Sequence, residues 1–198
     1  MAITAQQVKE LREKTGAGMM ECKKALAEAN GNLDEAVKFL RERGMAQAAK
    51  RSHRSTSEGM VHAYIHPGSK IGVLIEVNCE TDFVARTDDF KDLCKDLAMQ
   101  VAASNPLVVA REQVPENLVA AEKEIYKNQA LLSGKPEKVI EKIVEGKLND
   151  YYSKVCLMEQ TFVKDSNLTI DQLVKEKIAK TGENIAVRRF AMFRLGEE

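Results

Sequence analysis

Few side chains in this sequence have the types and spacing to bind a metal ion. His62 and His66 alternate onto one face of a strand-like segment, where four residues of extended chain separate them by roughly 13 Å. Both could contact one ion only if the chain bent, so the spacing favours histidines on the rim of a hairpin. We therefore predict neither a metal site nor another cofactor.

A second segment, Thr15-Gly16-Ala17-Gly18, has the glycines of a phosphate-binding loop and precedes a helix. A dinucleotide fingerprint needs a strand before it and a third small residue three places on. Here a helix precedes the loop, Glu21 takes that place, and no GxxxxGK[ST] occurs in the chain. We interpret the segment as a tight turn between two helices.

Nucleophilic catalysis finds no recognisable site either. The sequence has no GxSxG, and its four cysteines have no CxxC spacing. These cysteines are Cys22, Cys79, Cys94 and Cys156. They are typical of reduced, buried thiols in a cytoplasmic protein, and we predict that the chain is not an enzyme.

The charge balance argues against nucleic acid and membranes as partners. Thirty Lys and Arg residues balance thirty Asp and Glu residues, so the 198-residue chain has no large field of one sign. A basic cluster spans residues 41–54, but no aromatic residue is interleaved with it, which favours a solvated linker face. The apolar runs are far shorter than the ~18 residues that a membrane span requires. The protein is expected to be soluble.

The first fifty residues predict three short helices that share one core. Thr4 is a suitable N-cap for the first, which Gly16 ends. The second helix is expected from about Met19 to Ala29, and Asn32 caps the third, whose first expected end is Gly44. We predict a domain over residues 1–50 and a polar linker over residues 51–57.

The core predicted for residues 58–198 begins with a hairpin. Segments 60–65 and 71–77 are rich in β-branched residues, and Pro67-Gly68 suits the centre of a type II turn. Thr87 is expected to cap a helix with helical spacing from Phe90 to Ala102. A two-helix excursion follows over about 115–157, and Gly182 ends a last helix. A third strand over 185–195 must return to the hairpin, which gives an α+β core with a three-stranded antiparallel sheet.

Two features fit a purely structural role less well. Met19 and Met20 are adjacent, so only one side chain easily faces a three-helix core; the other suits an adaptable protein contact, although two core residues remain an alternative. Strand alternation places Phe83 on the core face of the second strand. Against this, Thr81-Asp82 interrupts the apolar pattern, and a loop there can project an aromatic anchor.

Four segments of the chain match the motifs of a known family. They are Thr15-Gly16-Ala17-Gly18-Met19-Met20-Glu21-Cys22-Lys23-Lys24-Ala25-Leu26, Asn32-Leu33-Asp34-Glu35-Ala36 with Leu40-Arg41, Asn78-Cys79-Glu80-Thr81-Asp82-Phe83-Val84-Ala85-Arg86, and the Ala-Val-Arg-Arg-Phe strand. Through them the chain resembles the elongation factor Ts family over nearly its whole length. This resemblance implies a ubiquitin-associated-like N-terminal domain, the same α+β core, and elongation factor Tu as partner.

The resemblance also implies a mechanism of nucleotide exchange. Asp82 and Phe83 would insert near the Mg²⁺ site of the partner's nucleotide domain, and the N-terminal domain would grip that domain. The residues that this similarity assigns to partner binding are Thr81, Asp82, Phe83, Val84, Arg12, Met19, Met20 and Lys23. A wedge that lowers the partner's affinity for GDP has its own affinity lowered by bound GDP to the same extent, through linkage. Exchange follows because the wedge and GDP each destabilise the binding of the other.

The chain looks like a short form of this family, because longer members have a second half of the core and a C-terminal helical module. A homodimer, in a complex of two factors with two partners, would replace the missing half. The alternative function is a non-catalytic adaptor built on the three-helix head. Such an adaptor has no need of the motif from Asn78 to Arg86.

Overall fold

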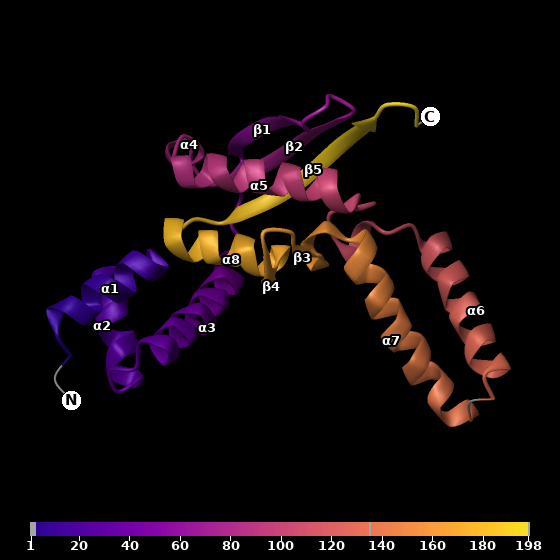
Figure 1. The fold of residues 1–198 in the computed structure, drawn as a ribbon, viewed down its shortest axis with the longest axis horizontal. Coiled ribbons are helices and arrows are strands. Elements are labelled where there is room, and N and C mark those ends of the chain that lie inside the picture. Colours follow the sequence, from indigo (N-terminus) through magenta and orange to yellow (C-terminus); the bar gives the residue numbers. More distant parts are fainter. Residues whose placement is uncertain (1–2, 135, 198) are drawn as a thin grey trace. The chain divides into compact units, whose positions relative to one another are not determined.

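Figure 1 shows the computed structural model, which describes residues 3–134 and 136–197. Three helices are followed by a core that combines a three-stranded antiparallel sheet with helices, so the predicted α+β class is confirmed. The contacts between residues divide the chain into two units. The first unit comprises residues up to Met60, Val77–Leu93 and Gln172–Ala186; the second comprises Val61–Glu76, Cys94–Asp171 and Val187 onwards.

The N-terminal helices of the first unit are α1 (Ala5–Thr15), α2 (Met19–Glu28) and α3 (Leu33–Arg51). They pack around a common core to which each contributes, with Leu11, Cys22, Leu26 and Ala36 fully buried. The predicted caps are confirmed. Thr4 and Gln7 form a capping box, Gly16 closes α1 with a φ of 68°, and Asn32 accepts hydrogen bonds from two N–H groups of α3.

The expected end of the third helix at Gly44 is wrong, because α3 continues to Arg51. A Cβ on Gly44 would lie 3.0 Å from Cβ of Ala179 in α8 (Ile170–Thr181). The glycine therefore allows two helices to approach closely and does not stop the first one. Residues 52–57 form neither helix nor strand. The domain boundaries predicted from the sequence stay a prediction.

The sheet has the order β1-β2-β5, with strands at Glu58–Ile65, Ile71–Cys79 and Ile185–Arg194. The hairpin turn has the geometry expected at its centre: Gly68 has a φ of 94°, and the Ser69 N–H donates to the His66 carbonyl at 2.9 Å. From Val73 to the end of β2 one face of the strand is buried, through Val73, Ile75, Val77 and Cys79. The two predicted hairpin strands and the returning third strand are confirmed.

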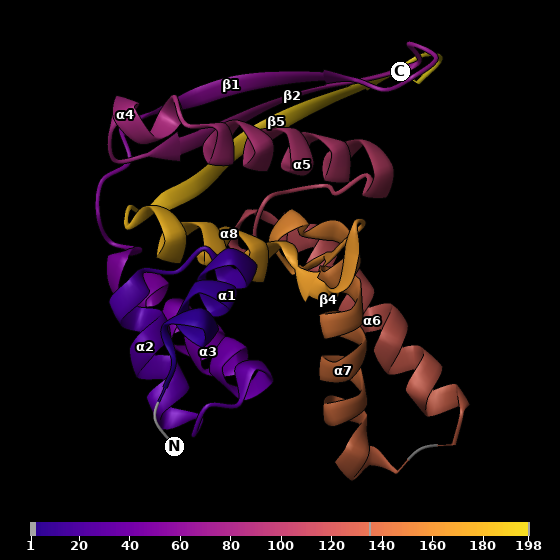
Figure 2. The same ribbon diagram turned by 60° about the vertical axis from the view of Figure 1, so that its left-hand side comes forward.

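Beyond the hairpin, Thr87 caps α5 (Asp88–Ser104) by accepting from the Phe90 N–H at 3.3 Å. In the second unit, α6 (Glu116–Leu132) and α7 (Glu137–Val155) run side by side in opposite directions (Figures 1 and 2). Both helices were predicted from the sequence. Short 3₁₀ helices at Arg111–Gln113 and Leu157–Glu159 flank this helical pair in the chain.

A second, two-stranded sheet was not predicted. Its strands, β3 (Thr161–Phe162) and β4 (Asp165–Thr169), pair antiparallel. The buried amide of Gln100 in α5 donates to the Thr161 carbonyl at 3.1 Å and accepts from the Val163 N–H at 2.9 Å. These hydrogen bonds, together with the pair between Lys164 and Asp96 of α5 at 2.6 Å, hold a hairpin that is too short to be stable alone.

The four cysteines all lie in the described part of the chain, where each is buried and none forms a disulfide. Burial raises the pKa of Cys79 and of Cys156 from 9.0 to about 11. A raised thiol pKa means that folding favours the neutral form. The contribution of these thiols to stability is therefore complete below pH 9.0, where the unfolded thiol is also neutral, and is lost as the pH rises towards 11.

We expect the native chain to react with none of its thiols when a disulfide reagent is added at about pH 8, because only an exposed thiolate attacks it. The unfolded chain should react at four thiols, and the urea midpoint should fall between pH 9.0 and about 11. Counting released chromophore and repeating the urea titration at both ends of this window measure the two effects. Rapid labelling of the folded chain would contradict the burial.

Gly59 and Gly146 make a second, paired prediction. Gly59 has a φ of 143°, and a Cβ there would lie 2.2 Å from the Val77 carbonyl oxygen, so Gly59→Ala should destabilise the fold by ~2 kcal/mol or more. Gly146 lies inside α7 with open space around it, so Gly146→Ala should stabilise by ~0.5–1 kcal/mol. Urea unfolding of both variants decides, and shifts of the same sign would refute this explanation.

Candidate functional site

The chain leaves the sheet after Cys79 and turns at once into a one-turn helix, α4 (Asp82–Ala85). Thr81 is its N-cap, because its hydroxyl oxygen accepts from the Val84 N–H at 3.4 Å. The Cys79 thiol donates to the Thr81 carbonyl at 3.1 Å. With these contacts the strand ends at Cys79, before Phe83. Strand alternation, which would have placed Phe83 on the core face, therefore does not reach this residue.

Helical geometry then decides which side chains of α4 point inward. Val84 and Ala85 are buried, whereas Phe83 is 78% exposed. The interpretation of Phe83 as a core residue is therefore wrong, because the residue sits on a helix and strand alternation no longer applies. Of the residues assigned to partner binding, Thr81, Asp82 and Phe83 are exposed, and Val84 anchors α4.

The carboxylate of Asp82 is paired locally. The Arg86 guanidinium donates to it at 2.7 Å, one helical turn further on. Both side chains are mostly exposed, so the pair contributes at most ~1 kcal/mol to stability. Little free energy is lost if a binding partner separates the two charges.

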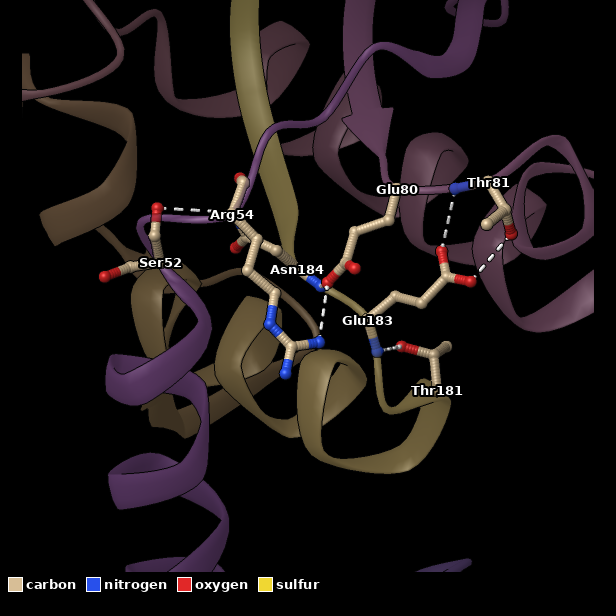
Figure 3. A network of polar contacts seen from close by, with 7 residues as sticks. All are labelled: Ser52, Arg54, Glu80, Thr81, Thr181, Glu183 and Asn184. Carbon is tan, nitrogen blue, oxygen red and sulfur yellow. Dashed lines mark hydrogen bonds and ion pairs between the residues drawn. The ribbon is translucent and has the colours of Figure 1, made fainter.

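A network of hydrogen bonds holds the residue that caps α4 (Figure 3). The carboxylate of Glu183, in the turn between α8 and β5, accepts from the Thr81 N–H at 3.0 Å and from the Thr81 hydroxyl at 2.7 Å. The Thr181 hydroxyl oxygen in turn accepts from the Glu183 N–H. The start of α4 is thus fixed by both polar groups of one threonine.

Neighbouring Glu80 joins the same turn to the segment after α3. Its carboxylate accepts from the Asn184 N–H at 2.6 Å and from the Arg54 guanidinium at 3.4 Å. The Asn184 hydrogen bond, helped by the positive charge of Arg54, lowers the pKa of Glu80. Glu80 is therefore a carboxylate at neutral pH, as these contacts require.

The side chain of Asn184 is 5% exposed and points to the same segment. It donates to the carbonyls of Ser52 at 3.3 Å and of Arg54 at 2.9 Å. A buried amide needs such partners, because an unsatisfied one would cost ~1–3 kcal/mol. Figure 3 shows Asn184 between this segment and Glu80.

The last turn of α8 also contacts α5 and the turn between α1 and α2. Lys180 and Lys177 both pair with Asp89, at 2.7 and 3.3 Å, and their hydrogen bonds lower the pKa of that carboxyl. A Cβ on Gly16 would lie 3.0 Å from Cε of Lys180. The turn that was excluded as a phosphate loop therefore packs against a lysine side chain.

The other predicted partner-binding residues lie on α1 and α2. Arg12 and Lys23 are exposed, and so are Met19 and Met20, at 59% and 66%. The expectation that one methionine faces the core is wrong, and so is the alternative that both do, because Cys22, Ala25 and Leu26 take the inward face of α2. We call Met19 and Met20 the methionine pair.

The structure places the two predicted groups in the same unit but on different elements. In both ribbon views α8 lies between α4 and the pair α1 and α2 (Figures 1 and 2). Sequence reasoning missed the residues of the turn after α8, Glu183 and Asn184. The sequence Gly182-Glu183-Asn184 indicates a turn, but nothing local indicates a partner about a hundred residues away.

In residues 3–134 and 136–197, no three His, Cys, Asp or Glu side chains are grouped so that they could hold a metal ion. Nor does this part of the chain contain a helix both long and apolar enough to cross a membrane.

Comparison with known proteins agrees with the resemblance read from the motifs. The family model for elongation factor TS matches residues 1–197. Elongation factor Ts of Heliobacterium modesticaldum is 60% identical over 195 residues, which cover 98% of this chain and 91% of that protein. The proteins of the same name from Moorella thermoacetica and Syntrophus aciditrophicus are 62% and 56% identical, over 98% and 100% of this chain and 96% and 98% of their own lengths. This chain therefore belongs to the elongation factor Ts family.

Proposed function

We propose that this chain binds elongation factor Tu and promotes release of its GDP, so that GTP can bind in turn. The observation that carries the proposal is the exposed Phe83 beside the Asp82 carboxylate on a helix of one turn, whose cap is held by Glu183. An aromatic side chain that is exposed in the free protein can contribute much of the binding free energy when a partner buries it.

The proposed mechanism needs no bond-breaking by this chain. GDP is held on its protein largely through Mg²⁺ and the loops around its phosphates. Insertion of Phe83 and Asp82 near that site would lower the affinity for GDP. Bound GDP would lower the affinity for this chain by the same factor. A second contact, through Arg12, Lys23 and the methionine pair, keeps the partner bound while the nucleotide leaves.

Phe83→Ala and Asp82→Ala should each slow stimulated GDP release severely, because truncating a buried anchor typically costs ~2–4 kcal/mol. The measurement is the release of fluorescent GDP from purified elongation factor Tu at saturating exchange factor.

Stability supplies the control for this test. Phe83→Ala should change the free energy of unfolding by less than ~0.5 kcal/mol, since the side chain is exposed. Phe90→Ala, at a residue that is 1% exposed, should cost ~3–5 kcal/mol. Unfolding of the Phe83→Ala chain together with normal exchange by Asp82→Ala would refute the role of α4.

The outer face of the sheet supports a homodimer that binds two partners. In the second unit this face carries exposed apolar side chains at Val61, Ile65, Leu74 and Phe193, and the exposed Leu195 follows directly after β5. Arg189 pairs on this face with Glu76 at 2.7 Å, and Ala191, two positions after Arg189, is exposed. Apolar patches of this kind on a sheet are typical of an interface, and twofold pairing is the commonest way to cover one.

Light scattering at micromolar concentration should give twice the mass of one chain. Phe193→Lys should give the mass of a single chain, because a dimer of this variant would have to bury an unpaired charge in its interface. Leu132→Lys is the matched control, since Leu132 is an exposed leucine on α6 and outside this face. A single-chain mass for the unsubstituted protein, with full exchange in a one-to-one complex, would exclude the dimer.

A further inference from the structure

Asn184 contacts two segments of the first unit that are far from it and from each other in sequence. Its side chain donates to the carbonyls of Ser52 and Arg54, which follow α3, and its backbone N–H donates to Glu80, which precedes α4. The amide is almost fully buried, so these hydrogen bonds are protected from competition with water. One residue therefore fixes the exit of α3 against the entry to α4.

The neighbouring residues complete this arrangement. Glu183 binds both polar groups of Thr81. The Arg54 guanidinium reaches Glu80, so the segment after α3 contacts the residues before α4 directly as well as through Asn184. Gly182, with a φ of 79°, ends α8 and turns the chain towards these contacts. Ser52 and Arg54, in the segment between α3 and β1, thus form a fixed connection between α3 and α4.

The fixed connection matters because it joins the parts of the chain that make the two proposed contacts with the partner. One contact precedes it in the sequence and the other follows it. The methionine pair lies on α2 of the three N-terminal helices, and Phe83 lies on α4. When two contacts on one chain are held in the geometry that the partner needs, the second forms with a high effective concentration. A loose connection would lower that concentration without altering either contact.

We propose that Asn184 is a positioning residue for nucleotide exchange: it holds the three-helix domain and Phe83 in one arrangement, so that both engage elongation factor Tu together. This inference rests on the proposed function and adds a role for a residue that touches no partner. Glu183 has a separate task, because it fixes α4 itself through Thr81. The two residues should therefore affect exchange in different ways.

A double-mutant cycle on the full chain tests the proposal. Its four proteins are the unsubstituted chain, Asn184→Ala, Met19→Ala with Met20→Ala, and the combination of all three substitutions. For each, fluorescent GDP release from elongation factor Tu gives the concentration of exchange factor for half-maximal stimulation and the maximal rate. Asn167→Ala is the control, since Asn167 is an exposed asparagine in β4 whose side chain bonds locally to Asp165.

Asn184→Ala should raise the half-maximal concentration by about tenfold or more, the size of effect that a lost effective concentration produces, with a nearly unchanged maximal rate. In the chain that already lacks the methionine pair, Asn184→Ala should raise it by less than about twofold, because there is no second contact left to coordinate. Asn167→Ala should have no effect.

The proposal would be overturned if Asn184→Ala raised the half-maximal concentration by the same factor with and without the methionine pair. Such independent effects would mean that Asn184→Ala only destabilises the chain in general. An unchanged half-maximal concentration in Asn184→Ala, or in the variant without the methionine pair, would overturn it too. If Asn184→Ala does not fold, Arg54→Gln replaces it: this substitution removes one exposed contact to Glu80 and should show a smaller effect that again vanishes without the methionine pair.

The failure of this inference is distinguishable from failure of the proposed function. If Phe83→Ala slows GDP release while Asn184→Ala and the methionine substitutions multiply, exchange through Phe83 stands and positioning by Asn184 falls. If the unsubstituted chain leaves GDP release unchanged, both proposals fall.

Discussion

The bond pair between Glu183 and Thr81 decides how the first unit is built around its exposed aromatic residue. It links two positions 102 residues apart in sequence, at the point where β2 has just ended. With both its N–H and its hydroxyl held, Thr81 cannot continue the strand ladder, and its hydroxyl oxygen is directed to the N–H of Val84. The chain must then turn as a helix, and helical geometry places Phe83 in solvent.

Local signals in the sequence were sufficient for most of the fold. The caps at Thr4, Asn32 and Thr87 and the turn at Pro67-Gly68 involve partners within four residues, so each can be read from a short window. The strands followed from β-branched residues and alternation. Family membership followed from the motifs around Met19 and Phe83, and the comparisons confirmed it.

Features that depend on distant contacts could not be predicted in this way. Gly44 has the sequence signal of a helix end, yet its role is to admit Ala179 of α8. Phe83 has the position of a core residue in an extended strand, but the turn at Thr81, which Glu183 binds, removes it from that pattern. The β3–β4 hairpin depends on Gln100, which is about sixty residues from its partners. In each case the deciding partner lies outside any local window.

The fixed cap of α4 has a consequence for the thermodynamics of any association that buries Phe83. An aromatic side chain exposed on a flexible loop must be ordered when it binds, and the lost conformational entropy opposes binding. Here the backbone of the turn is already ordered in the free chain by Thr81, so that entropy was lost on folding. The calorimetric signature of such a contact is a negative heat-capacity change from the buried ring, without the large unfavourable entropy that accompanies coupled folding.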